Sequence, residues 1–597
     1  MTDAAAAVEA ARRALAEAEA ALAAEKQDAA SPQPPADPPH EATPPQRVEP
    51  VETPQPAADT TPGPLTPQQV DAIRAGYAFE GSVLELGALV NGDALPDVQV
   101  RIPVAMLNRH GLVAGATGTG KTRTLQVLAE QLAANGVPVF AADIKGDLSG
   151  IATPGTTSDK LLARTRGIGQ DWTPAATPVE YYTLGGQGTG IPIRATVSSF
   201  GPLLLSKVLG LNATQESSLG LVFHYADKAG LPLVDLSDLR AVLSWLTSDE
   251  GKPELKELGG LSSATAGVIL RELITFADGG ADVFFGEPEI DTQLLLRTAA
   301  DGRGIVSLLE IPGVQDKPAL FSTFLMWLLA DLFNDLPEVG DLDKPKLVFF
   351  FDEAHLLFKD ASKDFVAAIT QTVRLIRSKG VGVVFVTQTP KDVPNDVLAQ
   401  VGSRIQHQLR AHTPDDAKAL RSTVSTYPTS GYDLGEVLTS LATGEAIVTV
   451  MSEKGAPTPV AWTRLRAPRG LMSPSPAEEM TAVVNSSPLL ATYGASVDRE
   501  SAREILAAKM NRAAEAEAAA DQAAAEKARA AEDAKLAKQY EKEWKEATRA
   551  KAPASRPKTT TRTRKQDNPV ADALSSRTGQ TVVREIVRGI FSTLKKR

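Results

Sequence analysis

Short apolar runs alternate with stretches of helical periodicity from about residue 67 to about residue 466. Apolar runs that are short and bounded by turn-forming residues are typical of strands buried on both faces. We predict such strands at Leu107–Gly115, Val137–Asp143, Gly304–Ile311, Lys346–Asp352 and Val381–Gln388. Strands and amphipathic helices in alternation indicate a parallel sheet with helices on both faces, so the expected fold class is α/β.

A long segment interrupts this alternation between about residues 150 and 303. Its apolar positions mostly recur with helical spacing, as in Leu203–Leu209, Ser218–Lys228 and Ala264–Phe276. We therefore expect one large domain over residues 67–480, with a mostly helical insertion inside it.

The N-terminal part of the chain has a different pattern. Residues 1–29 are rich in Ala and Glu, and Val8, Leu15 and Leu22 recur every seven residues. This spacing fits a short coiled-coil seam or, equally, a solitary helix. Residues 30–66 are rich in Pro, which lacks an amide donor, so they are expected to form an extended, disordered linker.

The C-terminal part predicts helices without a core of their own. Residues 498–550 predict one long polar helix, and residues 551–569 a basic linker. The only apolar stripe of the long helix is formed by Leu536, Tyr540 and Trp544. Residues 570–597 predict a basic amphipathic helix, which would contact a membrane surface, nucleic acid or a partner protein, or would dock on its own domain.

Composition narrows the class of protein. The chain has 597 residues, a formal net charge of −11 and no cysteine, which excludes disulfides, thiolate metal sites and cysteine nucleophiles. No apolar run approaches the roughly 20 residues that a membrane-spanning helix needs. The N-terminus lacks the basic and apolar regions of a secretory signal. We therefore expect a cytoplasmic protein.

One segment matches the phosphate-binding pattern G-x-x-x-x-G-K-[ST]. It follows an apolar strand and precedes a helix, which is the order that lets backbone amides and a helix N-terminus surround phosphate oxygens. The predicted nucleotide-binding residues are Gly115, Ala116, Thr117, Gly118, Thr119, Gly120, Lys121 and Thr122. Lys121 would reach the β- and γ-phosphates of ATP, and the Thr122 hydroxyl would ligate Mg²⁺. The alternative is an ordinary glycine-rich turn.

Two carboxylates follow the apolar strand at Lys346–Asp352. Ligands bind at the carboxyl ends of strands in open α/β sheets, so Asp352 would hold Mg²⁺ and Glu353 would polarise the attacking water. The alternative is that the pair caps the next helix. Together with the phosphate loop, the pair favours hydrolysis of ATP. The next strand ends at Gln388, which would sense the γ-phosphate or orient water, or would only make a strand-end hydrogen bond.

These motifs together resemble a known class. The phosphate loop, the strand Phe349-Phe-Phe-Asp-Glu353 and the run Arg374–Gln388 look like the HerA/FtsK class of motor ATPases. The blocks Asn108–Leu112, Asp143–Gly150, Gly201–Leu205, Phe284–Pro288 and Arg404–Arg410 look like the bacterial HerA-like family of the YjgR type. The resemblance covers residues 76–466 and the last helix.

The resemblance implies an additional-strand, RecA-like P-loop sheet, assembled as a hexameric ring with ATP and Mg²⁺ between subunits. Gln388 then stands where the family has its strand-end sensor. Arg377 stands where such motors carry an arginine finger that enters the neighbouring subunit's site. Its alternative is an exposed helical arginine, and Arg374 and Arg404 are further candidates for the finger.

Two classes of function follow. The first is an ATP-driven translocase or helicase that moves DNA through the ring without reading its sequence. The second is a regulatory or scaffold ATPase ring that acts on protein or at the membrane surface. The role of Asp143 and Lys145, which follow the strand at Val137–Asp143, stays open. His355 is interpreted as lining or packing against the site.

Overall fold

The computed structural model describes residues 63–186, 188–257, 260–311, 318–340, 342–358 and 363–549. The predicted helix 1–29, nearly all of the linker 30–66 and residues 551–597 lie outside the described residues. Within the described ranges, no helix is long and apolar enough to cross a membrane.

One mixed sheet organises the described part of the chain. In spatial order its strands are β2 (Asp93–Pro103), β1 (Val83–Asn91), β12 (Ala461–Leu465), β11 (Glu445–Thr449), β10 (Ser403–Gln406), β3 (Gly111–Ala114), β9 (Val381–Thr387), β8 (Leu347–Phe351), β4 (Val139–Asp143), β7 (Val306–Glu310), β5 (Val179–Leu184) and β6 (Ile191–Ile193). Strands β10 to β6 pair in parallel, whereas β2, β1, β12, β11 and β10 pair antiparallel.

The order β3-β9-β8 confirms the expected additional-strand P-loop sheet. Strand β9 is inserted between β3, which precedes the phosphate loop, and β8, which precedes the carboxylate pair. Every residue of these three strands is buried, as their continuous apolar runs predict. Phenylalanines form a row across the parallel strands, with ring centroids 5.2 Å apart for Phe140–Phe349, 5.7 Å for Phe349–Phe351 and 5.9 Å for Phe351–Phe385.

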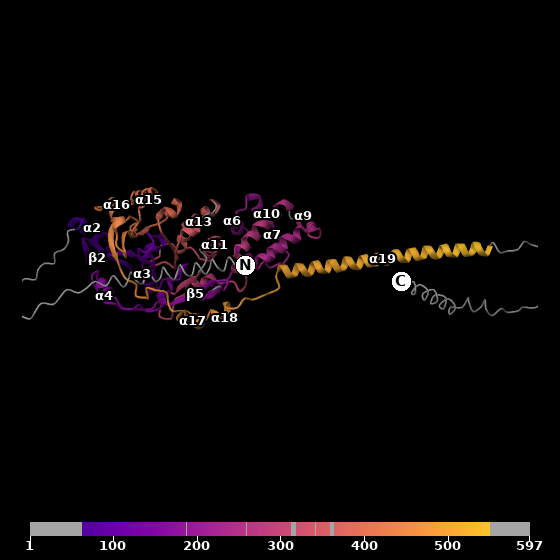
Figure 1. Ribbon diagram of the computed structural model, residues 1–597, viewed down its shortest axis with the longest axis horizontal. Coiled ribbons are helices and arrows are strands. Elements are labelled where there is room, and N and C mark those ends of the chain that lie inside the picture. Colours follow the sequence, from indigo (N-terminus) through magenta and orange to yellow (C-terminus); the bar gives the residue numbers. More distant parts are fainter. Residues whose placement is uncertain are drawn as a thin grey trace, which may run out of the picture. The chain divides into compact units, whose positions relative to one another are not determined.

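Helices surround the sheet (Figure 1). Those next to the parallel strands are α3 (Lys121–Ala134), α11 (Pro318–Asp335) and α13 (Lys363–Ile376). Near the antiparallel strands lie α2 (Pro67–Gly76), α15 (Pro414–Val424) and α16 (Leu434–Ser440). Phe140 of β4 contacts Phe324 of α11, with centroids 6.4 Å apart, so the aromatic row joins this helix to the sheet.

The insertion contains several helices and, in addition, two strands that were not predicted. The helices are α4 (Asp159–Arg166), α5 (Val197–Phe200), α6 (Pro202–Val208), α7 (Ala213–Lys228), α8 (Leu236–Thr247), α9 (Lys252–Glu257) and α10 (Ser263–Asp278). The segment also contains β5 and β6, which extend the sheet beyond β7. The adjacent Tyr181 and Tyr182 of β5 are both fully buried, so both faces of this strand are covered. The sequence therefore lacks the alternation of polar and apolar residues that marks a half-exposed strand.

Two further differences concern strand boundaries. The strand expected from Leu107 begins only at Gly111, because Val104–Arg109 is a 3₁₀ turn and His110 has a left-handed φ of 62°. The C-terminal antiparallel strands and the β1–β2 hairpin were not predicted. They are short or interrupted by bulges, so their period-two pattern is weak.

The long polar helix is α19 (Ala502–Arg549), reached through α17 (Ala477–Ser486) and α18 (Leu490–Tyr493). Only Ala502 and Leu506 of α19 are buried, and every residue from Lys509 to Arg549 is exposed. Its first turn is held to α8, where Asp238 accepts from the Ser501 hydroxyl at 2.5 Å and from the Arg503 amide at 3.0 Å.

Candidate nucleotide-binding site

The phosphate loop joins β3 to α3. Gly118 and Gly120 have left-handed φ values of 83° and 110°, and no side chain caps the N-terminus of α3. A Cβ on Gly115 would lie 2.4 Å from Cβ of His407, so only glycine fits there. Glycine therefore allows the tight curl that turns backbone N–H groups toward an anion at the helix N-terminus.

Lys121 begins α3 and is buried at the loop. Its Nζ donates to the Gly115 carbonyl at 2.7 Å and to the Ala116 carbonyl at 3.2 Å. Burial lowers the pKa of Lys121, while the charges of Glu353 and Asp352 act in the opposite direction. An anion close to Nζ would restore the stability of the ammonium form, which is the arrangement that a phosphate-binding lysine needs.

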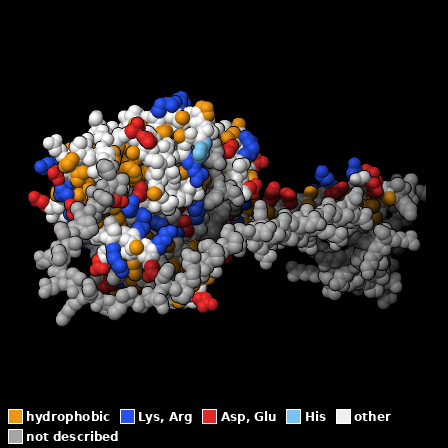
Figure 2. Space-filling model, turned by 60° about the vertical axis from the view of Figure 1, so that its left-hand side comes forward, with side chains coloured by type: hydrophobic (Ala, Val, Ile, Leu, Met, Phe, Trp, Pro, Cys, Tyr) orange, Lys and Arg blue, Asp and Glu red, His pale blue; other side chains and the backbone are white. Residues whose placement is uncertain are grey.

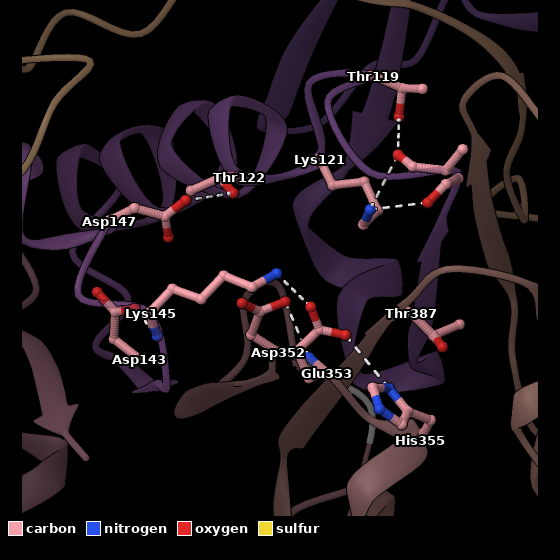
Figure 3. Close-up of polar contacts among 12 residues, drawn as sticks. Thr119, Lys121, Thr122, Asp143, Lys145, Asp147, Asp352, Glu353, His355 and Thr387 are labelled. Atoms are coloured by element: carbon pink, nitrogen blue, oxygen red, sulfur yellow. Dashed lines mark hydrogen bonds and ion pairs between the residues drawn. The ribbon is translucent and has the colours of Figure 1, made fainter. Parts of the chain in front are cut away.

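The neighbouring Thr122 points away from Lys121 and toward the turn after β4 (Figure 3). Its hydroxyl donates to Asp147 Oδ2 at 3.0 Å. Asp147 Oδ1 is buried and makes no hydrogen bond. Asp147 was not among the predicted site residues, because only the fold brings this loop to the start of α3.

Asp352 and Glu353 follow β8 and lie at the same edge of the sheet as the phosphate loop. Asp352 Oδ1 accepts from the Glu353 amide at 2.9 Å. The pKa of Asp352 is raised to about 7, mainly by burial and to a smaller extent by repulsion from Glu353. Glu353 has a φ of 49°, which is unusual for a residue with a side chain and typical of functional positions.

Two side chains contact the Glu353 carboxylate. Lys145 Nζ, from the turn after β4, forms an ion pair with Oε1, and His355 Nδ1 lies 3.2 Å from Oε2 (Figure 3). Burial alone would raise the pKa of Glu353, but Lys145 and His355 hold it below its ordinary value. The sequence left the role of Lys145 open, and the structure places it at the candidate base. His355 lines the site.

Asp143 shapes the turn that carries Lys145. Its carboxylate accepts from the backbone amides of Lys145 at 3.2 Å, Gly146 at 2.7 Å and Leu148 at 2.7 Å. Asp143 pairs in register with Glu310 of β7. Burial and the charges of Asp143 and Asp147 raise the pKa of Glu310 to about 8, so its carboxyl group is mostly protonated at pH 7.

Gln388 lies directly after β9, beside the phosphate loop. It lines a cavity of about 240 Å³ together with Ala116, Thr117 and the basic residues Lys391, Arg410 and His412. Gly115 donates its amide to the Thr387 carbonyl at 3.2 Å, which holds the end of β9 against the loop. Gln388 is exposed, so its side chain is accessible to a ligand at this edge.

The structure does not bring Arg377 to this edge. Arg377 precedes β9, whereas Gln388 follows it, and a seven-residue strand separates the two by roughly 23 Å. Arg374 is exposed in the last turn of α13, on the same side as Arg377. Arg404 of β10 donates to the Thr426 hydroxyl at 2.8 Å. None of the three lies at the phosphate loop of its own chain.

His407 packs against the phosphate loop, and the sequence did not predict this contact. It follows β10, is fully buried, and its Nε2 lies 3.0 Å from the Thr124 hydroxyl. Burial, assisted by the charge of Lys121, lowers its pKa to about 4, so the imidazole is neutral at pH 7. The sequence signal was weak, since a single histidine after a short strand is common.

The oxygen donors at this edge fit Mg²⁺. In the part of the chain that the structure describes, no group of three or more His, Cys, Asp or Glu side chains is arranged to hold a metal ion. Mg²⁺ in nucleotide sites needs only one or two carboxylates, because waters and substrate phosphates supply the other ligands. Asp352, whose charged form is disfavoured by burial, is the carboxylate that a cation would stabilise, and Thr122 supplies the hydroxyl.

Comparisons with known proteins identify the family of this chain. The family model of the helicase HerA-like C-terminal family matches residues 89–597. The DNA double-strand break repair helicase HerA of Saccharolobus solfataricus is 21% identical over 388 residues, 64% of this chain and 69% of that protein. The probable helicase MJECL08 of Methanocaldococcus jannaschii is 31% identical over 153 residues, 24% of this chain and only 28% of that protein.

Two solved structures are also similar to this chain. The bacterial conjugative coupling protein TrwB, lacking its first 70 residues, has a TM-score of 0.46 and 15% identity over 68% of this chain and 95% of its own. VirB4 of Thermoanaerobacter pseudethanolicus has a TM-score of 0.42 and 15% identity over 65% of this chain and 97% of its own.

Proposed function

The chain belongs to the helicase HerA-like C-terminal family, and on this premise we propose that it is an ATP hydrolase that works as a DNA-translocating motor. One observation carries the proposal. The phosphate loop after β3 and the carboxylate pair after β8 meet at one edge of the sheet, on either side of β9. That arrangement places a phosphate-binding group and a candidate base around one substrate.

The predicted site residues at this edge have separate chemical roles. Lys121 and the loop amides bind the β- and γ-phosphates, and Thr122 and Asp352 hold Mg²⁺. When bound, Mg²⁺ neutralises part of the phosphate charge. Glu353 accepts the proton of the attacking water, and Gln388 orients that water or contacts the γ-phosphate. These steps lower the barrier through positioning and electrostatics, as in other phosphoryl transfers.

Arg377 has its role in a neighbouring subunit. It lies at the end of β9 opposite to the phosphate loop, so it cannot assist its own site. We infer a homo-oligomeric ring, with six subunits as the expected number, in which Arg377 enters the next subunit's site. An arginine supplied in trans stabilises the charge that develops on the transferred phosphoryl group.

DNA is the proposed polymer, and contact with it is expected through phosphates. On the face drawn in Figure 2, Lys and Arg side chains gather in several separate groups among acidic ones. Lys391, Arg410 and His412 stand close to the nucleotide edge. Such contacts would be independent of sequence and strongly weakened by salt.

ATP hydrolysis against a panel of nucleic acids tests the proposal. Wild-type protein should hydrolyse ATP, and duplex DNA at low salt should stimulate turnover more than RNA does. The matched control is Lys121→Ala, which should show neither basal nor stimulated turnover. Turnover that ignores every nucleic acid would contradict the translocase function and favour a ring that acts on protein. Particle images of the same sample would count the subunits.

A further inference from the structure

Lys145 contacts the candidate base, yet the roles above do not use it. It lies 208 residues from Glu353 in the sequence and reaches Glu353 Oε1 from the turn after β4. The other oxygen, Oε2, lies 3.2 Å from His355 Nδ1. Glu353 therefore has a cation on one oxygen and an imidazole on the other (Figure 3).

This arrangement works against the chemistry expected of Glu353. A general base must offer a free lone pair to water, and an ammonium group on the carboxylate occupies one and reduces its basicity. Transfer of Lys145 to another anion would uncover Oε1 and make Glu353 a more effective base.

The same surroundings supply that anion when ATP binds. Figure 3 draws the Lys145 and Lys121 nitrogens on the same side of the Glu353 carboxylate, the side of the phosphate loop, and the charge of Lys145 bears on Lys121. The γ-phosphate that Lys121 is proposed to contact is then within reach of a flexible lysine stem. The side chain of Lys145 is 38% exposed, so it can move without opening a cavity.

Hydrogen bonds hold the backbone of the turn that carries Lys145. Asp143 holds the turn through three backbone amides, and Gly146 takes a left-handed φ of 71° directly after Lys145. The turn therefore presents the lysine from a constant position. An exchange of partners would involve rotation of the side chain and not refolding of the loop.

We propose that Lys145 discriminates triphosphate from diphosphate by exchanging the Glu353 carboxylate for the γ-phosphate of ATP, which frees Glu353 to act as the base only when ATP is bound. The proposal rests on the proposed function as an ATPase. It assigns Lys145 a ligand contact and a gating effect on Glu353, and the exchange breaks one ion pair and forms another without any covalent step.

Direct binding of a non-hydrolysable ATP analogue and of ADP tests this exchange. Lys145→Met should weaken binding of the analogue by about 10- to 100-fold, because it removes a hydrogen bond to a charged group. It should change ADP binding by less than about twofold. Lys145→Arg should keep most of the preference. Lys160→Met, at an exposed lysine of α4, is the matched control and should change neither affinity.

A second variant tests the competition itself. Glu353→Gln removes the carboxylate that competes for Lys145, so it should tighten binding of the ATP analogue but not of ADP. That gain should disappear in the Lys145→Met background. Equal gains with and without Lys145 would overturn the exchange.

The two proposals fail in different ways. Wild-type protein that binds neither nucleotide, or Lys121→Ala that binds as well as wild type, would contradict the ATPase function and with it the role of Lys145. Wild-type protein that binds nucleotide, with the same preference for the ATP analogue in wild type and Lys145→Met, would contradict the role of Lys145 alone.

Discussion

The two ends of the parallel strands differ in the functional groups that they carry. At the carboxyl ends, β3, β9, β8 and β4 bring the phosphate loop, Gln388, the carboxylate pair and Lys145 to one edge. At the amino end of β9, Arg377 faces no phosphate loop of its own chain. The carboxyl end is thus a nearly complete site, whereas the amino end presents a group whose proposed partner is another subunit.

Removing Arg377 should have the largest effect on turnover. Arg377→Ala should lower kcat by about 10³-fold or more while nucleotide binding stays close to wild type, because a trans arginine acts on the transition state. Steady-state ATPase assays and direct binding measure the two effects. Arg374→Ala is the control on the same side of the sheet.

Mixed rings sharpen this comparison of strand ends. Arg377→Ala subunits keep an intact phosphate loop, and Lys121→Ala subunits keep the arginine. Mixing the two inactive variants should therefore restore part of the turnover. A mixture as inactive as its components would argue against a role of Arg377 across the interface.

Glu353→Gln should have the next largest effect, at the carboxyl end. Loss of the base should lower turnover by about 10²- to 10⁴-fold, while nucleotide still binds. Single-turnover hydrolysis compared with nucleotide binding measures this separation. If binding fell in parallel with hydrolysis, Glu353 would be a structural residue of the site.

Lys121→Ala should mainly weaken nucleotide binding. It removes the buried ammonium group from the phosphate site, so nucleotide affinity should fall by about 10- to 100-fold or more, with turnover falling accordingly. Calorimetric titration with ADP and with an ATP analogue checks this. The exposed Lys160→Met again serves as the control, and wild-type affinity in Lys121→Ala would remove Lys121 from the phosphate site.

The smallest effect concerns stability at the amino ends of β3 and β9, where the buried His110 makes two hydrogen-bond contacts. Its Nε2 lies 2.7 Å from the Val373 carbonyl, and its Nδ1 accepts from the Val383 amide at 3.1 Å. Burial, partly offset by the Val373 hydrogen bond, lowers the pKa of His110 to about 4 from its ordinary 6.5. Between these values the unfolded chain binds a proton that the folded protein does not.

Stability should therefore fall as the pH is lowered from 6.5 to 4, and His110 should contribute up to about 3 kcal/mol of this loss. Denaturant unfolding of His110→Gln across this range should show a shallower decline than wild type. His224→Gln, at an exposed histidine, should decline as wild type does. Parallel curves for wild type and His110→Gln would show that His110 can be protonated in the folded protein.

Sequence reasoning succeeded where local chemistry decides the structure. The phosphate loop needs glycines at Gly118 and Gly120 because their φ values are positive, and the buried strand before Asp352 needs its continuous apolar run. Such demands are visible in a short window of sequence. The strands β5 and β6 were missed, because their place at the edge of the sheet depends on pairing with β7 and with each other.

By itself, the sequence determined the α/β class. It also predicted the phosphate loop with Lys121 and Thr122 and the carboxylate pair Asp352–Glu353, because each depends on residues that are neighbours along the chain. Only the tertiary structure decided that Lys145 pairs with Glu353 and that Arg377 lies at the other end of β9. These relations join residues on different strands. Strand order and register set them, through packing and hydrogen bonds between segments that are distant in sequence.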